Sequence, residues 1–184
     1  RSCVFYYDNR DNNRNRLYYQ IIDPGGSMLL APGGIPLGGF YPSAKYIASL
    51  ALPGLGIALV YQDPQTYLQI IDFSGNLLLA GSGILITASR PIEMKLSLEG
   101  SDIYLGWLEN TGTGNPGSKR LMGQRIANLQ AQWTEGGKQL VDNIPALNAR
   151  INASAGSYYV WYQRFSAVNS FLPCILKVDA DGDP

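Results

Sequence analysis

Short apolar runs, each ending at a turn signal, recur along the whole chain. In the clearest copies an aromatic or apolar run leads into an Asp and a Gly, and a second apolar run follows. The first two copies are residues 18–30 (YYQIIDPGGSMLL) and 67–79 (YLQIIDFSGNLLL). Residues 122–127 (MGQRIA) and 175–182 (ILKVDADG) give a third and a fourth copy, and Ala127 stands where the third Asp would fall. The Asp position therefore recurs at residues 23, 72, 127 and 179, which is a spacing of 49 to 55 residues.

A strand-rich period near fifty residues is the size of one β-propeller blade, a four-stranded antiparallel sheet. No long window holds the 3.6-residue apolar period of a helix. The prediction is therefore all-β: a single β-propeller segment of about three and a half four-stranded blades, part of a larger ring. The predicted blades are residues 1–39, 40–89, 90–143 and 144–184.

Within these repeats the apolar runs predict individual strands. The first repeat lacks its inner strand and begins at residues 3–7, whereas the fourth lacks its outer strand. The second repeat predicts strands at residues 44–50, 56–62, 66–72 and 76–87, and the third at 92–98, 102–109, 120–127 and 132–141.

Turn residues and aromatic residues repeat with the strands. In Asp-x-x-Gly the Asp side chain caps a hairpin turn and Gly takes a positive φ. Glycine pairs in the outer strands (33 and 34, 81 and 83, 136 and 137) predict a bulge or bend at the rim. Residues 4–10 (VFYYDNR) align with 104–110 (YLGWLEN) and 159–164 (YVWYQR), and these aromatics are expected to fill the space between blade faces.

The charge balance makes some partners unexpected. Fourteen basic and fourteen acidic residues give zero net charge, and only 15% of residues are charged. We therefore expect no nucleic acid partner, because nothing attracts the phosphate backbone. No apolar run reaches the roughly 18 residues of a membrane helix, so the chain is not expected to span a membrane. His, the commonest general base and metal ligand, is absent.

Taken in order, residues 6–10 (YYDNR), the polar residues 11–16 and residues 18–26 (YYQIIDPGG) carry a resemblance to a known type. They resemble the β-propeller repeats of large secreted bacterial proteins, notably those that Bacteroidetes export by type IX secretion. Residues 177–182 (KVDADG) are a further match, whereas 128–131 (NLQA) depart from the pattern. The resemblance implies an extracellular or cell-surface scaffold and carries over no catalytic residues.

The candidate ligand or partner residues lie in loops and on aromatic positions. Residues 8–16 hold three Arg, four Asn and two Asp, and the Arg side chains could bind an acidic group or belong to a solvated loop. Aromatic residues such as Tyr46 and Tyr158 could stack on sugar rings or pack between blades. The candidate site residues are Asp8, Arg10, Arg14, Arg16, Tyr41 and Trp161.

No cofactor is expected, although the acidic end of the chain leaves calcium open. Asp179, Asp181 and Asp183 match part of a calcium loop, but a hairpin turn fits the repeat better. Cys3 and Cys174 either form a disulfide or are two buried thiols. Because the chain begins Arg-Ser-Cys, without Met, we expect it to be a processed or trimmed part of something longer.

Two functions compete. The first is a non-enzymatic binding or scaffold module that presents propeller loops to a protein or glycan partner. The second is part of a propeller-type glycoside-processing enzyme that uses paired carboxylates. The candidate carboxylates for the enzyme, Asp63, Glu93, Glu99 and Asp102, form no recognisable motif. Since the predicted blades leave open sheet edges, a protein partner or a further chain is expected to complete the propeller.

Overall fold

The computed structural model describes residues 1–10, 16–38, 45–110, 118–145, 150–154, 157–165, 171–179 and 183. The regular structure in these ranges is all β-strand, which confirms the all-β class. None of the described segments forms a helix able to cross a membrane.

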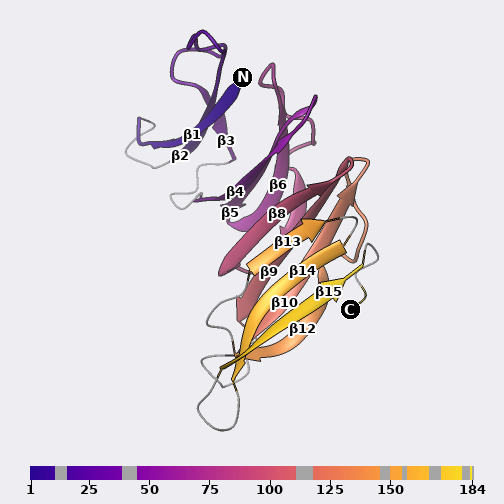
Figure 1. The fold of residues 1–184 in the computed structure, drawn as a ribbon. Helices are drawn as coiled ribbons and strands as arrows, with labels where there is room; N and C mark the ends of the chain where they lie inside the picture. Colours follow the sequence, from indigo (N-terminus) through magenta and orange to yellow (C-terminus); the bar gives the residue numbers. More distant parts are fainter. Residues whose placement is uncertain are drawn as a thin grey trace. The chain divides into compact units, whose positions relative to one another are not determined.

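Four antiparallel sheets follow one another along the chain (Figure 1). Strands that follow in sequence pair within each sheet, except that β11 and β12 both pair with β10. In the described residues none of these sheets closes on itself. Sheet 1 has β1 (Ser2–Asp8), β2 (Arg16–Ile22) and β3 (Ile35–Leu37), and sheet 2 has β4 (Lys45–Leu52), β5 (Gly56–Asp63), β6 (Gln65–Asp72) and β7 (Ile84–Thr87). Sheet 3 has β8 (Glu93–Glu99), β9 (Asp102–Asn110), β10 (Ser118–Ala127), β11 (Gln130–Ala131) and β12 (Lys138–Pro145), and sheet 4 has β13 (Arg150–Ser154), β14 (Ser157–Phe165) and β15 (Phe171–Val178).

The chain forms two compact units, Arg1–Ala88 with sheets 1 and 2, and Ser89–Pro184 with sheets 3 and 4. Sheets 1, 2 and 4 lie inside the first, second and fourth predicted repeats, and sheet 3 extends slightly beyond the third, residues 90–143, to Pro145.

An aspartate closes the same hairpin turn in three sheets. The Asp23 carboxylate accepts the Ser27 amide at 2.8 Å, and the Asp72 carboxylate accepts the Asn76 amide at 2.8 Å. The Asp179 carboxylate accepts the Asp183 amide at 3.0 Å in the same way. In sheet 3, where Ala127 replaces the Asp, a two-residue turn with positive φ at Asn128 and Leu129 joins β10 to β11. Asn128 and Leu129 thus make a shorter turn at the same place, and Gln130 and Ala131 form the strand that follows it.

A buried glutamine lies three residues before each of the first three turns, and its side chain binds backbone groups of the segment that follows the turn. Gln69 is fully buried, and its Oε1 accepts the amides of Ile70 at 2.9 Å and Leu79 at 3.0 Å. Its Nε2 donates to the Leu79 carbonyl at 3.1 Å. Gln20 and Gln124 make the corresponding bonds in sheets 1 and 3. We call this arrangement the glutamine clamp; in sheet 4 Leu176 takes its place, three residues before Asp179.

The predicted outer strands 76–87 and 132–141 are wrong in their first halves. The clamp holds residues after the turn away from a regular ladder, and β7 begins only at Ile84, while β12 begins at Lys138. A glycine turn lies between: Gly83 donates to the Ala80 carbonyl at 3.0 Å and Gly137 to the Thr134 carbonyl at 2.9 Å. The predicted bend at the glycine pairs is therefore confirmed.

The first unit packs its two sheets face to face. Sheet 1 contributes Leu17, Tyr19 and Ile21, which lie on the face opposite to the Gln20 side chain. Sheet 2 contributes Leu59 and Tyr61, among others, from the face that carries Gln69. Burial of this apolar surface stabilises the pair of sheets.

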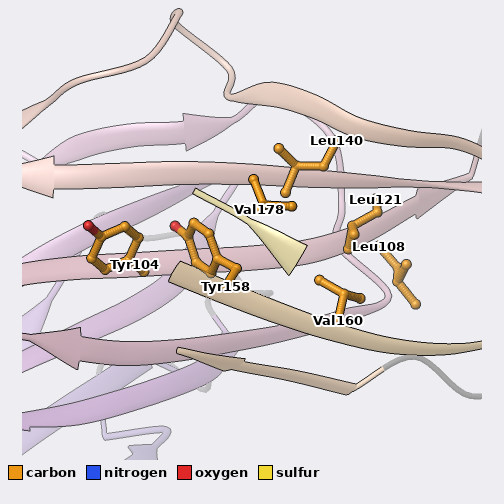
Figure 2. Packing of buried hydrophobic residues seen from close by; sticks show 7 residues of the cluster. All are labelled: Tyr104, Leu108, Leu121, Leu140, Tyr158, Val160 and Val178. Atoms are coloured by element: carbon orange, nitrogen blue, oxygen red, sulfur yellow. The ribbon is translucent and has the colours of Figure 1, made fainter. Parts of the chain in front are cut away.

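The second unit repeats the same choice of faces. Sheet 3 contributes Tyr104, Leu108 and Leu121, which lie on the face opposite to Gln124, and sheet 4 contributes Tyr158 and Val160 (Figure 2). Figure 2 shows the two tyrosine side chains beside each other, and their ring centroids are 4.7 Å apart with planes at 83°. This edge-to-face geometry is a preferred arrangement of aromatic pairs.

The hydrogen-bond register corrects the alignment of the aromatic strands by one residue. Val4 pairs with Gln20 and Leu105 pairs with Gln124, so the two residues are structural counterparts. The counterpart of Trp107 is therefore Tyr6, not Tyr7. A one-residue slip moves every side chain to the other face of a sheet, which apolar patterning cannot detect when both faces are apolar.

Candidate binding site

The charged residues of the predicted loop site are engaged with neighbouring groups. The Asp8 carboxylate accepts the Arg10 amide at 2.8 Å and binds its guanidinium, which also lies 4.8 Å from the centre of the Tyr18 ring. The Arg10 side-chain hydrogen bond lowers the pKa of Asp8, and the same bond raises the pKa of Arg10. Arg16 donates to the Gly38 carbonyl at 2.9 Å. These contacts fix the ends of β1 and β2; binding of an acidic group remains a prediction, and Arg14 lies outside the described residues.

The predicted sugar-stacking aromatics divide into buried and exposed ones. The prediction that Tyr158 is exposed and could stack on a sugar ring is wrong. Tyr158 is fully buried, and its hydroxyl donates to the Gln124 carbonyl at 2.6 Å. Burial raises its pKa. Tyr46 is 42% exposed and Trp161 is 50% exposed, so both keep surface for a ligand. Tyr41 lies outside the described residues.

Tyr46 forms one wall of a cavity in the first unit. The cavity has a volume of about 220 Å³ and is lined by Phe5, Tyr7, Leu17 and Tyr46; we call it the aromatic hollow. The Phe5 and Tyr46 ring centroids are 5.7 Å apart, and the Tyr46 amide donates to the Tyr7 hydroxyl at 2.6 Å. The hollow is thus held between the start of β4 and the end of β1. Apolar walls of this kind suit a single apolar side chain or the face of a sugar ring.

Sequence reasoning missed the aromatic hollow because it assigned these aromatics to packing between blades. Tyr7 is 50% exposed, although its neighbours in the same sheet, Leu17 and Tyr19, are fully buried. The missing inner strand of the first repeat was the one signal that could have found the hollow.

A second apolar surface lies on the outer face of sheet 4. Trp161 on β14 is directly opposite Ile175 on β15, which is 57% exposed. Arg150 is opposite Trp161 on the other side, and Lys177 is opposite the adjacent Tyr159, so charged groups border the apolar pair. We call Trp161, Ile175 and Tyr159 the sheet 4 patch. An apolar centre with a polar border is typical of surfaces that bind a partner.

Two of the carboxylates considered for an enzyme, Glu93 and Asp102, bind arginine side chains. Asp102 binds Arg125 with oxygen–nitrogen distances of 2.7 and 2.9 Å. Glu93 binds Arg150 at 2.8 Å. Asp63 is 8% exposed at the end of β5, and Glu99 ends β8. These contacts assign Asp102 and Glu93 to holding strands together.

Glu109 is a polar residue that sequence reasoning missed. It is 2% exposed, and it accepts the Trp107 indole N–H at 2.7 Å, the Arg120 guanidinium at 2.8 and 3.1 Å, and the Ser89 hydroxyl. A buried carboxylate needs such a set of donors because desolvation of the charge is costly. Its sequence signal is the acid two residues after the inward aromatic, which recurs as Asp8 after Tyr6.

The residues considered for a calcium site and for a disulfide are Asp179, Asp181, Asp183, Cys3 and Cys174. The Asp179 carboxylate closes its turn on Asp183, and Asp181 lies outside the described residues. In the described part of the chain no three His, Cys, Asp or Glu side chains gather where they could hold a metal ion. Cys3 and Cys174 are free thiols, and burial raises the pKa of Cys3 to about 12.

No protein-family model matches this chain, and no curated protein matches its sequence. The assignment of a function therefore rests on the chain's own residues.

Proposed function

We propose that this chain is a non-enzymatic binding and scaffold module, built as a segment of a β-propeller. The observation that carries the proposal is that sheets 2 and 3 bury both of their faces. In sheet 2, Leu59 and Tyr61 on one face and Val60 and Leu68 on the other are 0 to 1% exposed. In a two-layer sandwich each sheet leaves one face to solvent, whereas an inner blade of a propeller is covered on both.

The choice of faces supports the same architecture. In the first unit, sheet 2 packs the face that carries Gln69 against the face of sheet 1 that lies opposite to Gln20. In the second unit, sheet 4 packs the face that carries Leu176, the counterpart of the glutamine, against the face of sheet 3 that lies opposite to Gln124. Each unit therefore joins its two sheets through the same pair of faces in the same order. Repetition of one junction produces tandem stacking of the kind found in repeat proteins.

The sheet 4 patch supports binding of a partner. By register, Trp161 and Ile175 are the counterparts of Phe5 and Tyr19 in sheet 1. Tyr19, with Phe5 beside it, packs against the next sheet, but Trp161 and Ile175 remain 50% and 57% exposed. Trp and Tyr are enriched in the centres of interfaces and in sugar-binding surfaces because they supply large flat contact areas. We propose that the patch meets a protein or glycan partner of a secreted or cell-surface bacterial protein, of the type that Bacteroidetes export by type IX secretion.

Incubation with polysaccharides separates a binding module from an enzyme. The 184-residue protein is passed over immobilised xylan, pectin, chitin and peptidoglycan, and over envelope proteins of a Bacteroidetes species, and the released sugars are analysed. The proposal predicts retention on one of these probes without new reducing ends. It also predicts at least tenfold weaker retention of Trp161→Ala, but unchanged retention of Leu129→Ala, a substitution of another exposed apolar residue. Release of oligosaccharides would contradict the proposal and favour the glycoside-processing alternative.

A further inference from the structure

Sheet 1 differs from the other three sheets at one edge. In sheets 2, 3 and 4 the strand that carries the inward aromatic has an inner neighbour: β4 beside β5, β8 beside β9 and β13 beside β14. β1 is the counterpart of β5 and β9, because Val4, Leu59 and Leu105 each pair with the clamp glutamine. β1 nevertheless stands at the end of its sheet, so its outer backbone groups have no strand partner in the described residues. An open strand edge is a template for a further strand.

The aromatic hollow lies where the inner neighbour of β1 is expected. In the second unit, the inner strands β8 and β13 lie side by side, and the Arg150–Glu93 ion pair at 2.8 Å joins them (Figure 1). In the first unit, β4 is the inner strand of sheet 2, and the hollow has Tyr46 of β4 on one side and Phe5 and Tyr7 of β1 on the other. The position that β8 fills beside β13 is thus a cavity beside β4.

We propose that the β1 edge and the aromatic hollow together form an acceptor site for an extended β-strand segment that lies outside residues 1–184. The incoming strand pairs antiparallel with β1, as β4 pairs with β5, and places one apolar side chain in the hollow. This inference rests on the proposed function and specifies its partner as an extended peptide segment. Backbone hydrogen bonds supply the affinity of such strand addition, and the side-chain pocket supplies the selectivity.

The sequences of the existing inner strands define the occupant. β4 (KYIASLAL), β8 (EMKLSLE) and β13 (RINAS) each begin with a charged residue and contain Ala or Ser near their centre. Cross-strand partners share a face, so the residue opposite Phe5 points toward the hollow. In sheet 2 the residue at that place is Ala48, opposite Val60. The occupant is therefore a segment of five to eight residues with a small or medium apolar side chain facing the hollow.

A second copy of the chain is a poor donor. Its inner strands β4, β8 and β13 are already paired with β5, β9 and β14, so donation would require one of its own sheets to open. The loss of a complete strand ladder opposes that exchange. A free segment carries no such cost beyond its own ordering.

The test uses the full 184-residue protein and a capped synthetic peptide with the β4 sequence, KYIASLAL. Amide hydrogen exchange is measured with this peptide and with a scrambled peptide of the same composition. The proposal predicts that only the β4 peptide slows exchange of β1 amides that point away from β2, by at least tenfold. It further predicts that Tyr7→Lys, which places a charge at the hollow, weakens binding at least tenfold. Val4→Lys, on the same strand but the opposite face, leaves binding within about twofold.

Three results would overturn the proposal. They are protection outside β1, equal effects of the two lysine substitutions, and a concentration-dependent dimer that protects β1 and that the peptide does not displace. If Tyr7→Lys lowers the thermal unfolding midpoint, Tyr46→Ser is used instead, because it changes the hollow from sheet 2. Failure of peptide binding leaves retention by the sheet 4 patch intact, so the two proposals fail separately.

Discussion

The glutamine clamp is the residue-scale device that shapes each repeat. A glutamine amide presents one acceptor and one donor group in the geometry of a peptide bond, so it can satisfy backbone groups that no neighbouring strand reaches. In sheet 2 it binds the amides of Ile70 and Leu79 and the carbonyl of Leu79. Leu or Met of similar size would leave these groups buried and unsatisfied.

Replacement of Gln69 by Leu is expected to destabilise the first unit by about 3 kcal/mol, since three buried backbone hydrogen bonds lose their partner. Urea unfolding measured by tyrosine fluorescence gives this value. Gln139→Leu, at an exposed position of β12, is the matched control and is expected to change stability by less than about 0.5 kcal/mol. Equal effects of the two substitutions would show that the clamp contributes nothing.

Glycine is required at position 83, in the glycine turn before β7, because a side chain there would clash with the backbone. Gly83 has φ +98°, and a Cβ there would lie 2.1 Å from the Leu68 carbonyl oxygen, which is backbone and cannot move aside. Gly83→Ala is therefore expected to cost about 3 kcal/mol or more. Gly81→Ala, at φ +57° with open space around the Cβ, is expected to cost about 1 kcal/mol. Thermal unfolding of both variants checks the difference, and a smaller loss for Gly83→Ala would refute the steric argument.

The Asp72 turn makes stability depend on acid pH. Hydrogen bonds from the Asn76 side chain and amide, in that order, lower the pKa of Asp72 below its ordinary value of 3.8. A carboxyl group with a lower pKa in the folded state stabilises the fold when ionised. This contribution is complete above the ordinary pKa and is lost as the pH falls through the folded value.

Asn76→Ala is expected to raise the pKa of Asp72 toward its ordinary value, because it removes the side-chain bond. Carboxyl carbon chemical shifts followed by NMR between pH 2 and pH 6 measure the change. Asn152→Ala, at an exposed position in the other unit, should leave the Asp72 titration unchanged. An Asp72 pKa that does not respond to Asn76→Ala would contradict the assigned cause.

At the scale of elements, the strands that end at a turn signal were predictable. Residues 56–62 and 102–109 were predicted as strands, and β5 (Gly56–Asp63) and β9 (Asp102–Asn110) lie there. Both the apolar run and the turn chemistry are local, so the sequence contains the information. The outer strands were predicted too long because the clamp bonds between Gln69 and Leu79 are not local and leave no periodic signal.

The candidate site was less predictable, since its residues depend on which neighbours are present. Tyr158 and Trp161 lie three residues apart on one strand, yet one is fully buried and the other is half exposed. Strand alternation puts them on opposite faces, and only the packing of sheets 3 and 4 decides which face is covered. The aromatic hollow likewise depends on the unpaired edge of β1, which composition does not reveal.

Glu109 joins β9 to β10 through Arg120. Glu109→Gln is expected to destabilise the second unit by about 2 kcal/mol, because the neutral amide binds Arg120 less strongly and Arg120, 39% exposed, recovers part of the loss in water. The indole of Trp107 donates to the same carboxylate, so its fluorescence should change with the substitution. Glu99→Gln, at the end of β8, is the control. Unchanged stability of Glu109→Gln would show that the buried carboxylate is not structural.

At the scale of the whole molecule, the four sheets use the same pair of packing faces in each unit. Three of them share the Asp turn, and three share the glutamine clamp. Sheets 2 and 3 bury apolar residues on both of their faces. Repeats with this property gain stability from their neighbours, which is the physical reason for tandem arrays. The proposed binding functions of the sheet 4 patch and of the β1 edge follow from the same property, because these are the places where a neighbour is lacking in the described residues.

A crystal structure of the 184-residue chain is the most direct test of this architecture. The account predicts that the four sheets radiate from a common axis, with β4, β8 and β13 nearest to it and each sheet covering the next. Sheets joined instead into one two-layered sandwich, with one face of sheet 2 open to solvent, would contradict it.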